Sequence, residues 1–269
     1  MNKRFEIFLF IILFYLICTS IVSGSDYKVN TNAQLFILEK LKTHHIVFLG
    51  TTHKKPAILK FMLELIPALH DAGVTHIGLE ITSSQQAKTD NFIQTGKKLN
   101  NIKIHPLIDC LEYRNLLAKL ATLDPNMRPK TIALDLPTLK KLGKISRDKW
   151  MAWSIVKVFH KNPKAKMLVL AGNVHVLKVL NWQDNIRNQH RSMYRYLKDI
   201  MPEIRIFSIS QLIDENPEEC DFTEVFGSID GSVVINCDRR FDGWKFGLSS
   251  IIAIKPTAIC DLVDGIIIY

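Results

Sequence analysis

Short apolar runs alternate with longer segments in which apolar residues recur every three or four positions, from about residue 33 onward. The longer segments have the spacing of amphipathic helices, and the short runs that of buried strands. Helices are predicted at 33–41, 56–69, from Ser83–Ser84 to about Thr95, at 111–123 and after Ser146. Strands are predicted at 46–49, 74–81, 102–107, 131–136, 166–171 and 204–209, with a last strand at the carboxyl terminus. This alternation predicts an α/β fold of three layers, with helices on both faces of a mostly parallel central sheet.

The first residues do not fit this pattern. Lys3 and Arg4 precede an apolar stretch from Ile7 to Val22, and small residues follow at Ser23–Gly24. A basic start, an apolar core and small residues at the cleavage point are typical of a signal peptide, and the stretch is short for a membrane span. We therefore predict that residues 1–24 are removed on export to a periplasmic or extracellular space, leaving one domain, 25–269. The alternative is an uncleaved segment that anchors the chain in a membrane.

Composition and net charge limit the classes of ligand that the protein is expected to bind. The 269 residues are 47% hydrophobic, enough for one sizeable core, and the formal net charge is +9. Loss of Lys3, Arg4 and Glu6 with the leader lowers that charge to +8, which favours an anionic substrate through long-range attraction. The lysines are scattered and lack interleaved aromatic residues, so no nucleic-acid partner is predicted. The four cysteines outside the leader form no C-x-x-C pair, and both disulfides and free thiols remain open for Cys110, Cys220, Cys237 and Cys260.

Two phrases with the pattern Gly-x-x-His each follow a predicted buried strand. They are Gly50–His53 and Gly172–His175. A glycine at the end of a strand allows a sharp turn, and ligands of open α/β sheets bind at the carboxyl ends of the strands. Histidine transfers protons near neutral pH and binds metals. A lone loop histidine is usually structural, but two with the same local pattern predict one site built from both halves of the chain.

Two further charged residues are candidates for this site. Glu80 ends the predicted strand 74–81, where a carboxylate is costly to bury without a partner; its structural alternatives are a helix cap or a lysine partner. Arg147 opens the helix after Ser146 and could orient Glu80 or stabilise an oxyanion, or lie on the surface. Asp148 has a sufficient explanation as a helix-dipole partner. His105, within the predicted strand 102–107, is interpreted as a core residue.

No motif of a serine hydrolase, a P-loop, a dinucleotide-binding site or a zinc helix is present. Instead, five segments in this order resemble the superfamily of erythromycin esterases, ChaN-like haem-binding lipoproteins, TraB proteins and Tiki metalloproteases. The segments are Val47–His53, Gly78–Glu80, Arg147–Ala152, Val169–His175 and Asp264–Ile267. The resemblance implies a three-layer ChaN or erythromycin-esterase-like α/β fold with one catalytic site of His53, Glu80, Arg147 and His175.

The branches of this superfamily imply different chemistry. Esterase-like members activate water with the histidines and the glutamate, Tiki-like members hold a divalent metal such as manganese or cobalt, and ChaN-like members bind haem. Thr51 stands where esterase and ChaN motifs usually carry Glu, which favours the Tiki and TraB form, Gly-Thr-x-His. The leading hypothesis is therefore an exported hydrolase of ester or peptide bonds in small-molecule or peptide substrates. His53, Glu80 and His175 would be ligands of a divalent metal, or one histidine would act as a general base without metal. The alternatives are a haem-binding protein without hydrolytic activity and a degenerate, inactive member.

Overall fold

The computed structural model describes residues 29–30, 32–138, 145–180, 191–212, 233–237, 245–246 and 257–269. The predicted signal peptide, Cys220 and His190 lie outside these ranges. Among the helices within them, none combines the length and apolar character needed to cross a membrane.

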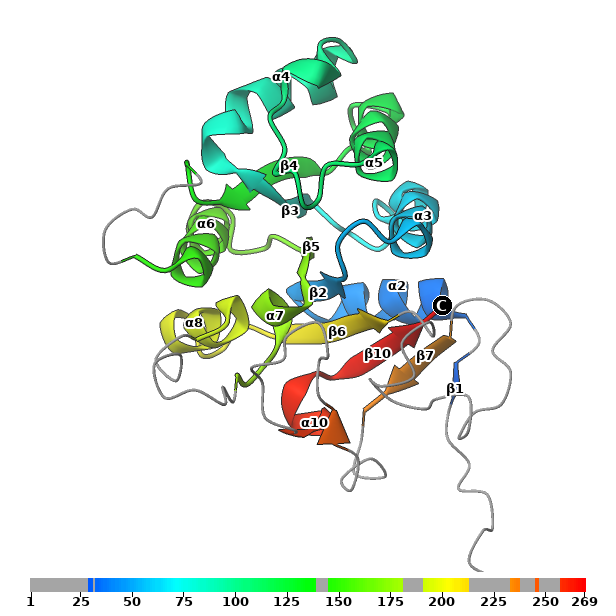
Figure 1. The fold of residues 1–269 in the computed structure, drawn as a ribbon, viewed down its shortest axis with the longest axis vertical. Coiled ribbons are helices and arrows are strands. Elements are labelled where there is room, and N and C mark those ends of the chain that lie inside the picture. Colours follow the sequence, from blue (N-terminus) through cyan, green and yellow to red (C-terminus); the bar gives the residue numbers. More distant parts are fainter. Residues whose placement is uncertain are drawn as a thin grey trace, which may run out of the picture.

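One sheet of eight strands organises the described residues (Figure 1), in the order β1-β7-β10-β6-β2-β5-β3-β4. The six strands from β10 to β4 run parallel, while β7 and β1 add antiparallel strands at one edge. This confirms the predicted mostly parallel sheet. The strands are β1 (Val29–Asn30), β2 (Ile46–Thr51), β3 (His76–Thr82), β4 (Lys130–Asp135), β5 (Met167–Gly172), β6 (Ile206–Leu212), β7 (Val233–Asn236) and β10 (Gly265–Ile268); β8 (Lys245–Phe246) and β9 (Thr257–Ala258) form a separate pair.

Helices cover both faces of the sheet, as the alternating pattern predicts. Side chains of β2 show why: Val47 and Leu49 join one apolar cluster with α2, α3 and α5, whereas Ile46 and Phe48 join a second with α6 and α8. Both clusters consist of residues largely removed from water, which supplies the main stabilisation of a three-layer fold. The helices are α2 (Ala33–Thr43), α3 (Pro56–Leu65), α4 (Gln86–Thr95), α5 (Leu111–Thr122), α6 (Arg147–Lys161), α7 (Asn173–Val176), α8 (Met193–Ile200) and α10 (Ile259–Leu262).

The start of α6 matters for function because it carries Arg147 and Asp148. The hydroxyl of Ser146 accepts a hydrogen bond from the amide of Lys149 at 3.2 Å, as the sequence predicted for a helix cap. This cap fixes the first turn of α6, so both charged side chains project from a defined position.

The prediction of a strand at 102–107 is wrong. These residues form turns after a 3₁₀ segment (Leu99–Asn101), and His105 is a half-buried turn residue rather than a core residue of a strand. The carbonyl of His105 accepts hydrogen bonds from the amides of Ile108 and Asp109, and its Nδ1 accepts one from Leu107. Ile102 and Ile104 still enter the core, so their apolar alternation is explained without strand pairing. The helix α8 was not predicted.

The strand order brings together the carboxyl ends of the strands that carry the predicted site residues. After β2, the chain passes over one position to β3 and β4, returns to insert β5 between β2 and β3, and then crosses to β6 on the other side of β2. Such a reversal leaves a crevice at the carboxyl ends of the central strands, where α/β proteins bind ligands.

Candidate functional site

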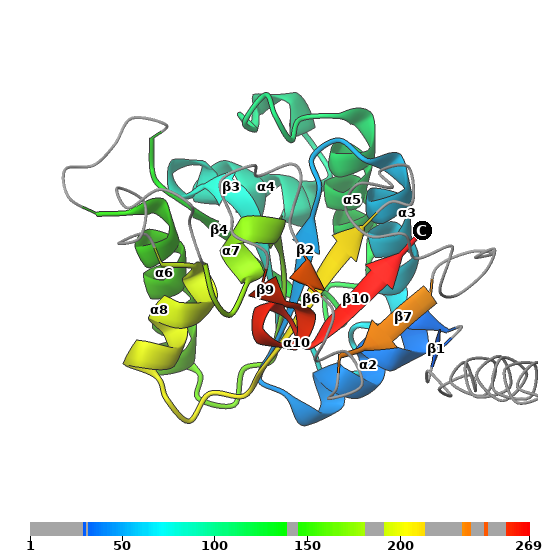
Figure 2. The same ribbon diagram turned by 60° about the horizontal axis from the view of Figure 1, so that its bottom comes forward.

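The predicted site residues follow neighbouring strands of the sheet. His53 follows β2, His175 follows β5 and Glu80 lies near the end of β3, and these three strands are consecutive in the order β2-β5-β3. His175 lies in the short helix α7, which packs beside the end of β2 and near α8 (Figure 2). The structure therefore brings together residues that are far apart in the sequence.

The three side chains meet at Gly172, the last residue of β5. A Cβ atom placed on Gly172 would lie 3.3 Å from Cε1 of His53 and 3.6 Å from both Oε2 of Glu80 and Cδ2 of His175. The glycine thus leaves open the point around which both histidines and the carboxylate gather. Gly172 has φ of −54°, so its absence of a side chain serves this space and not a left-handed backbone.

Glu80 reaches this point from a local irregularity of the sheet. Leu79 pairs with Ala133 and Thr82 with Asp135, so β3 has one residue more than β4 between these pairs. A bulge of this kind redirects a side chain at the end of a strand. Glu80 is 4% exposed, and its Oε2 accepts a hydrogen bond of 2.7 Å from the amide of Gly172. Burial would raise the pKa of Glu80, but the charges of His175 and Arg147 and this amide hold it below its usual value. Glu80 is therefore a carboxylate at neutral pH.

Arg147 links three residues of the site. Its Nε and Nη2 donate to Oδ1 and Oδ2 of Asp135 at 2.7 and 2.8 Å, Nη2 also donates to Oε1 of Glu80, and Nη1 lies 3.3 Å from Nε2 of His175. The guanidinium therefore forms its bidentate pair with Asp135. The sequence had suggested Glu80 as this partner. Burial disfavours its charge, but the bonds to Asp135 and the charge of Glu80 raise the pKa of Arg147 overall. Arg147 is a fixed cation that positions Glu80 and His175.

Asp148 orients the imidazole of His175 and favours its protonated form. Its Nδ1 lies 2.9 Å from Oδ1 of Asp148, and the same oxygen accepts the amide N–H of Met193 at 2.9 Å. Because the carboxylate can only accept, Nδ1 carries a proton and Nε2 faces the site. Burial alone would lower the pKa of His175, but the charge and hydrogen bond of Asp148, with the charge of Glu80, raise it.

His53 has the opposite tendency. The residue is exposed at the surface, but partial desolvation of its ring lowers its pKa, and the nearby charge of Glu80 offsets this effect only in part. The imidazole is thus neutral near pH 7 and able to accept a proton. The following residue, Lys54, has φ of 55°, a left-handed conformation that costs energy for a residue with a side chain. This turn leads the chain from His53 into α3.

The two Gly-x-x-His motifs also contact each other through Gly50 and Asn173. A Cβ atom on Gly50 would come within 2.3 Å of Oδ1 of Asn173, so Gly50 makes room for that side chain. Asn173 in turn donates to the carbonyl of Gln211 at 3.2 Å and accepts from the hydroxyl of Ser210 at 3.0 Å. The asparagine of the second motif therefore ties the ends of β2, β5 and β6 together, and the two motif glycines have different functions.

The donor set does not fit a divalent metal as arranged. Both oxygens of Glu80 are engaged, one by the amide of Gly172 and the other by Arg147, and the guanidinium also lies beside Nε2 of His175. A dication placed among His53, Glu80 and His175 would face this fixed positive charge at short range. Within the described part of the chain, no group of three or more His, Cys, Asp and Glu side chains is arranged to hold a metal ion.

A small hollow lies beside the convergent side chains. Its polar lining includes His53, Glu80 and Tyr113, and Leu59, Ile108 and Leu170 form an apolar wall. The hollow measures about 10 Å³, the size at which a cavity begins to hold one water molecule. This hollow is far too small for a porphyrin, so it does not itself provide a site for the haem of the alternative prediction.

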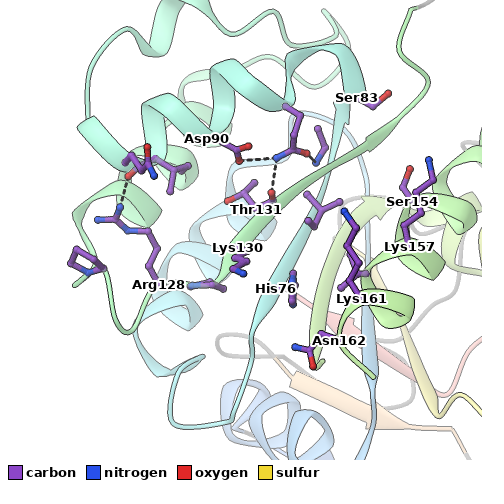
Figure 3. Close-up of a pocket in the computed structure, with 18 residues that line it drawn as sticks. His76, Ser83, Asp90, Arg128, Lys130, Thr131, Ser154, Lys157, Lys161 and Asn162 are labelled. Atoms are coloured by element: carbon purple, nitrogen blue, oxygen red, sulfur yellow. Dashed lines mark hydrogen bonds between the residues drawn. The ribbon is translucent and has the colours of Figure 1, made fainter. Parts of the chain in front are cut away.

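A larger cleft of about 950 Å³ runs along the outer edge of β4 between α4 and α6 (Figure 3). Two of its polar side chains, Gln86 and Arg128, bind backbone groups of the protein itself. The side-chain amide of Gln86 donates to the carbonyl of Thr131 at 2.8 Å and accepts from the amide of Ala133 at 2.7 Å, which caps the free edge of the strand. Arg128 donates to the backbone carbonyls of Ile93, Ala121 and Leu123. None of the predicted site residues is among those that line the cleft, so we place the candidate site at the strand ends.

Three residues at the site were missed by the sequence interpretation. Asp135 ends β4, as Glu80 lies near the end of β3, and an acid at the end of an apolar run was a signal that could have identified it. Asp148 was assigned only to the helix dipole, although it also contacts His175. Tyr113 lies on the buried face of α5, and nothing in its local sequence distinguishes it from a core aromatic residue.

Neither a protein-family model nor a curated protein sequence matches this chain. Solved structures do share its fold. An erythromycin esterase, EreC, as an H289N mutant in its open conformation, aligns with a TM-score of 0.65 and 12% identity over 89% of this chain and 93% of that chain. A succinoglycan biosynthesis protein aligns with a TM-score of 0.60 and 12% identity over 87% and 90%. The haem-binding ChaN of Campylobacter jejuni aligns at 0.47 and 14% identity over 91% and 98%, a likeness too low to support an argument. The predicted erythromycin-esterase-like α/β fold is thus confirmed.

Proposed function

We propose that this protein is a hydrolase that transfers an acyl group from an ester or amide to water by general acid–base catalysis. The observation that carries this proposal is the convergence of His53, Glu80 and His175 around Gly172, with the pKa values of the two histidines moved in opposite directions. Two titratable groups whose environments separate their pKa values are suited to act as base and acid.

His53 is the base in this scheme. Its neutral imidazole takes a proton from a water molecule as the water oxygen attacks the carbonyl carbon, and Glu80 stabilises the imidazolium that forms. His175 is the acid. Arg147 offers only donors, so its Nη1 bonds to Nε2 of His175 while that nitrogen is unprotonated; when Nε2 takes up a proton this bond is lost, and the proton is directed to the leaving group as the acyl bond breaks. Each step leaves the balance of protons intact, and no step requires a metal.

The substrate class follows from chemistry and charge. The site supports attack on a carbonyl of a small-molecule or peptide substrate, and the positive net charge favours an anionic one. The amino-terminal sequence supports export, after which the protein would meet its substrate outside the cytoplasm.

The first prediction concerns turnover. The wild type is first assayed on a panel of p-nitrophenyl esters, short peptides and erythromycin to identify a substrate that it hydrolyses. Erythromycin is included because one structural neighbour is named after it. His53→Ala, Glu80→Gln and His175→Ala should each lower kcat/KM about 10²–10⁴-fold, the usual contribution of a general acid or base. Double variants should lose little more than single ones, since residues acting as a unit are non-additive.

His160→Ala is the matched control, because His160 is exposed on α6 and away from the strand ends; it should retain full activity. Treatment with a chelator should leave the wild-type rate unchanged. Loss of activity on chelation with recovery on adding manganese would contradict the metal-free mechanism, and losses that multiply across double variants would show that the two histidines act independently.

A further inference from the structure

Tyr113 lines the hollow beside His53 and Glu80 and has a buried hydroxyl. The side chain comes from α5, is 4% exposed and lines the hollow from the helical side. Its hydroxyl is buried and lies near the backbone of Glu80, but it makes no hydrogen bond of normal geometry. A buried hydroxyl without a partner is unfavourable for folding, so a phenylalanine would suit this position better on stability alone.

The protonation state of Tyr113 makes it a donor. Burial, followed by the neighbouring charge of Glu80, raises the pKa of its phenol well above the usual value. The hollow that it lines has the size of one water site, and two of its other polar groups, neutral His53 and ionised Glu80, are acceptors; Lys54 also borders the hollow but is exposed. The hydroxyl of Thr51, which also borders the hollow, is already used by the carbonyl of Thr52. Tyr113 is therefore the buried hydrogen-bond donor for a water molecule in this hollow.

We propose that Tyr113 is a further residue of the catalytic site, which holds the attacking water in the hollow by donating its hydroxyl proton to the water oxygen. This inference rests on the proposed function. The water donates its two protons toward His53 and Glu80 and accepts from Tyr113, which leaves one lone pair for the carbonyl carbon. When the new carbon–oxygen bond forms, the water proton passes to His53, the bond to the leaving group breaks and that group takes the proton of His175. Tyr113 keeps its own proton throughout.

The test compares Tyr113→Phe with Tyr269→Phe on an ester that the wild type hydrolyses. Tyr113→Phe should lower kcat about 10- to 100-fold with little change in KM, since one donor to a reacting atom is removed, while Tm stays equal or rises. Tyr269 is the matched control because its hydroxyl has a partner, Oε1 of Gln211 at 2.5 Å. Tyr269→Phe should lower Tm and leave kcat unchanged.

The outcomes separate the two proposals. If the wild type hydrolyses the ester and Tyr113→Phe retains its full kcat, the role of Tyr113 is wrong while the hydrolase proposal stands. If Tyr113→Phe loses kcat and Tm together, as expected when a structural partner is removed, the role of Tyr113 is again wrong. If the wild type hydrolyses no ester or amide of the panel, the proposed function fails, and the role of Tyr113 fails with it.

Discussion

At the residue scale, Asp148 distinguishes the two motif histidines. It binds Nδ1 of His175 and raises the pKa of that imidazole, whereas partial desolvation of the exposed His53 lowers the pKa of His53. A base must be neutral, so activity should rise as the pH passes upward through the pKa of His53, below 6.5. An acid must be protonated, so activity should fall as the pH passes through the pKa of His175, above 6.5.

Asp148→Asn keeps the acceptor for Nδ1 but removes the charge that raises the pKa of His175. We predict that it shifts the alkaline limb of the pH–rate profile to lower pH and leaves the acid limb in place; an unmoved alkaline limb would contradict the assignment of His175.

Much of this site could be predicted from single residues, because a histidine or an acid directly after a buried strand is visible in the sequence. His53, Glu80 and His175 were identified in this way, and Arg147 from its place at a helix start and the family resemblance; the four lie together. The bidentate pairing of Arg147 with Asp135 could not be predicted, since it depends on β4 lying next to β3. Tyr113 was equally hidden, because a tyrosine facing a site and a tyrosine filling a core have the same helical spacing.

At the element scale, the glycines that end β2 and β5 should respond differently to the same substitution. In Gly50→Ala the new methyl group would meet Asn173 and Val176 at 2.3 and 2.7 Å, and such overpacking costs about 1–3 kcal/mol or more of unfolding free energy. In Gly172→Ala the neighbours lie at 3.3 to 3.6 Å and φ suits alanine, so stability should change by less than about 1 kcal/mol. The methyl group would nevertheless occupy the space among His53, Glu80 and His175, and kcat/KM should fall at least tenfold. Urea denaturation and ester hydrolysis of both variants measure the two effects; a fully active Gly172→Ala enzyme would mean that this space is not used in the reaction.

Elements with one long, regular pattern could be predicted closely, and α6 with its Ser146 cap is an example. The segment 102–107 could not, because buried residues at alternate positions satisfy a strand pattern even when turns place them in the core. The bulge before Glu80 is likewise invisible in the sequence, since it results from pairing with β4.

At the scale of the whole molecule, strand order decides whether the motifs form a site. The sequence predicts parallel strands that end at one edge, but β2, β5 and β3 could still have been distant within the sheet. Insertion of β5 between β2 and β3 makes their ends neighbours, and the strand spacing of about 4.8 Å then allows the side chains to meet. This order arises from long-range packing of helices on both faces, which a local pattern does not encode. Outside the described residues, the predicted removal of residues 1–24 stays a prediction.

The central claim is that the two histidines differ in acidity, with His53 the base and His175 the acid. The most direct measurement is an NMR titration of the imidazole nitrogens of the folded protein, with the two signals assigned through His53→Gln and His175→Gln variants. The account predicts that His53 titrates below pH 6.5 and His175 above it. Titration of His175 below His53 would contradict the assignment of base and acid and with it the proposed mechanism.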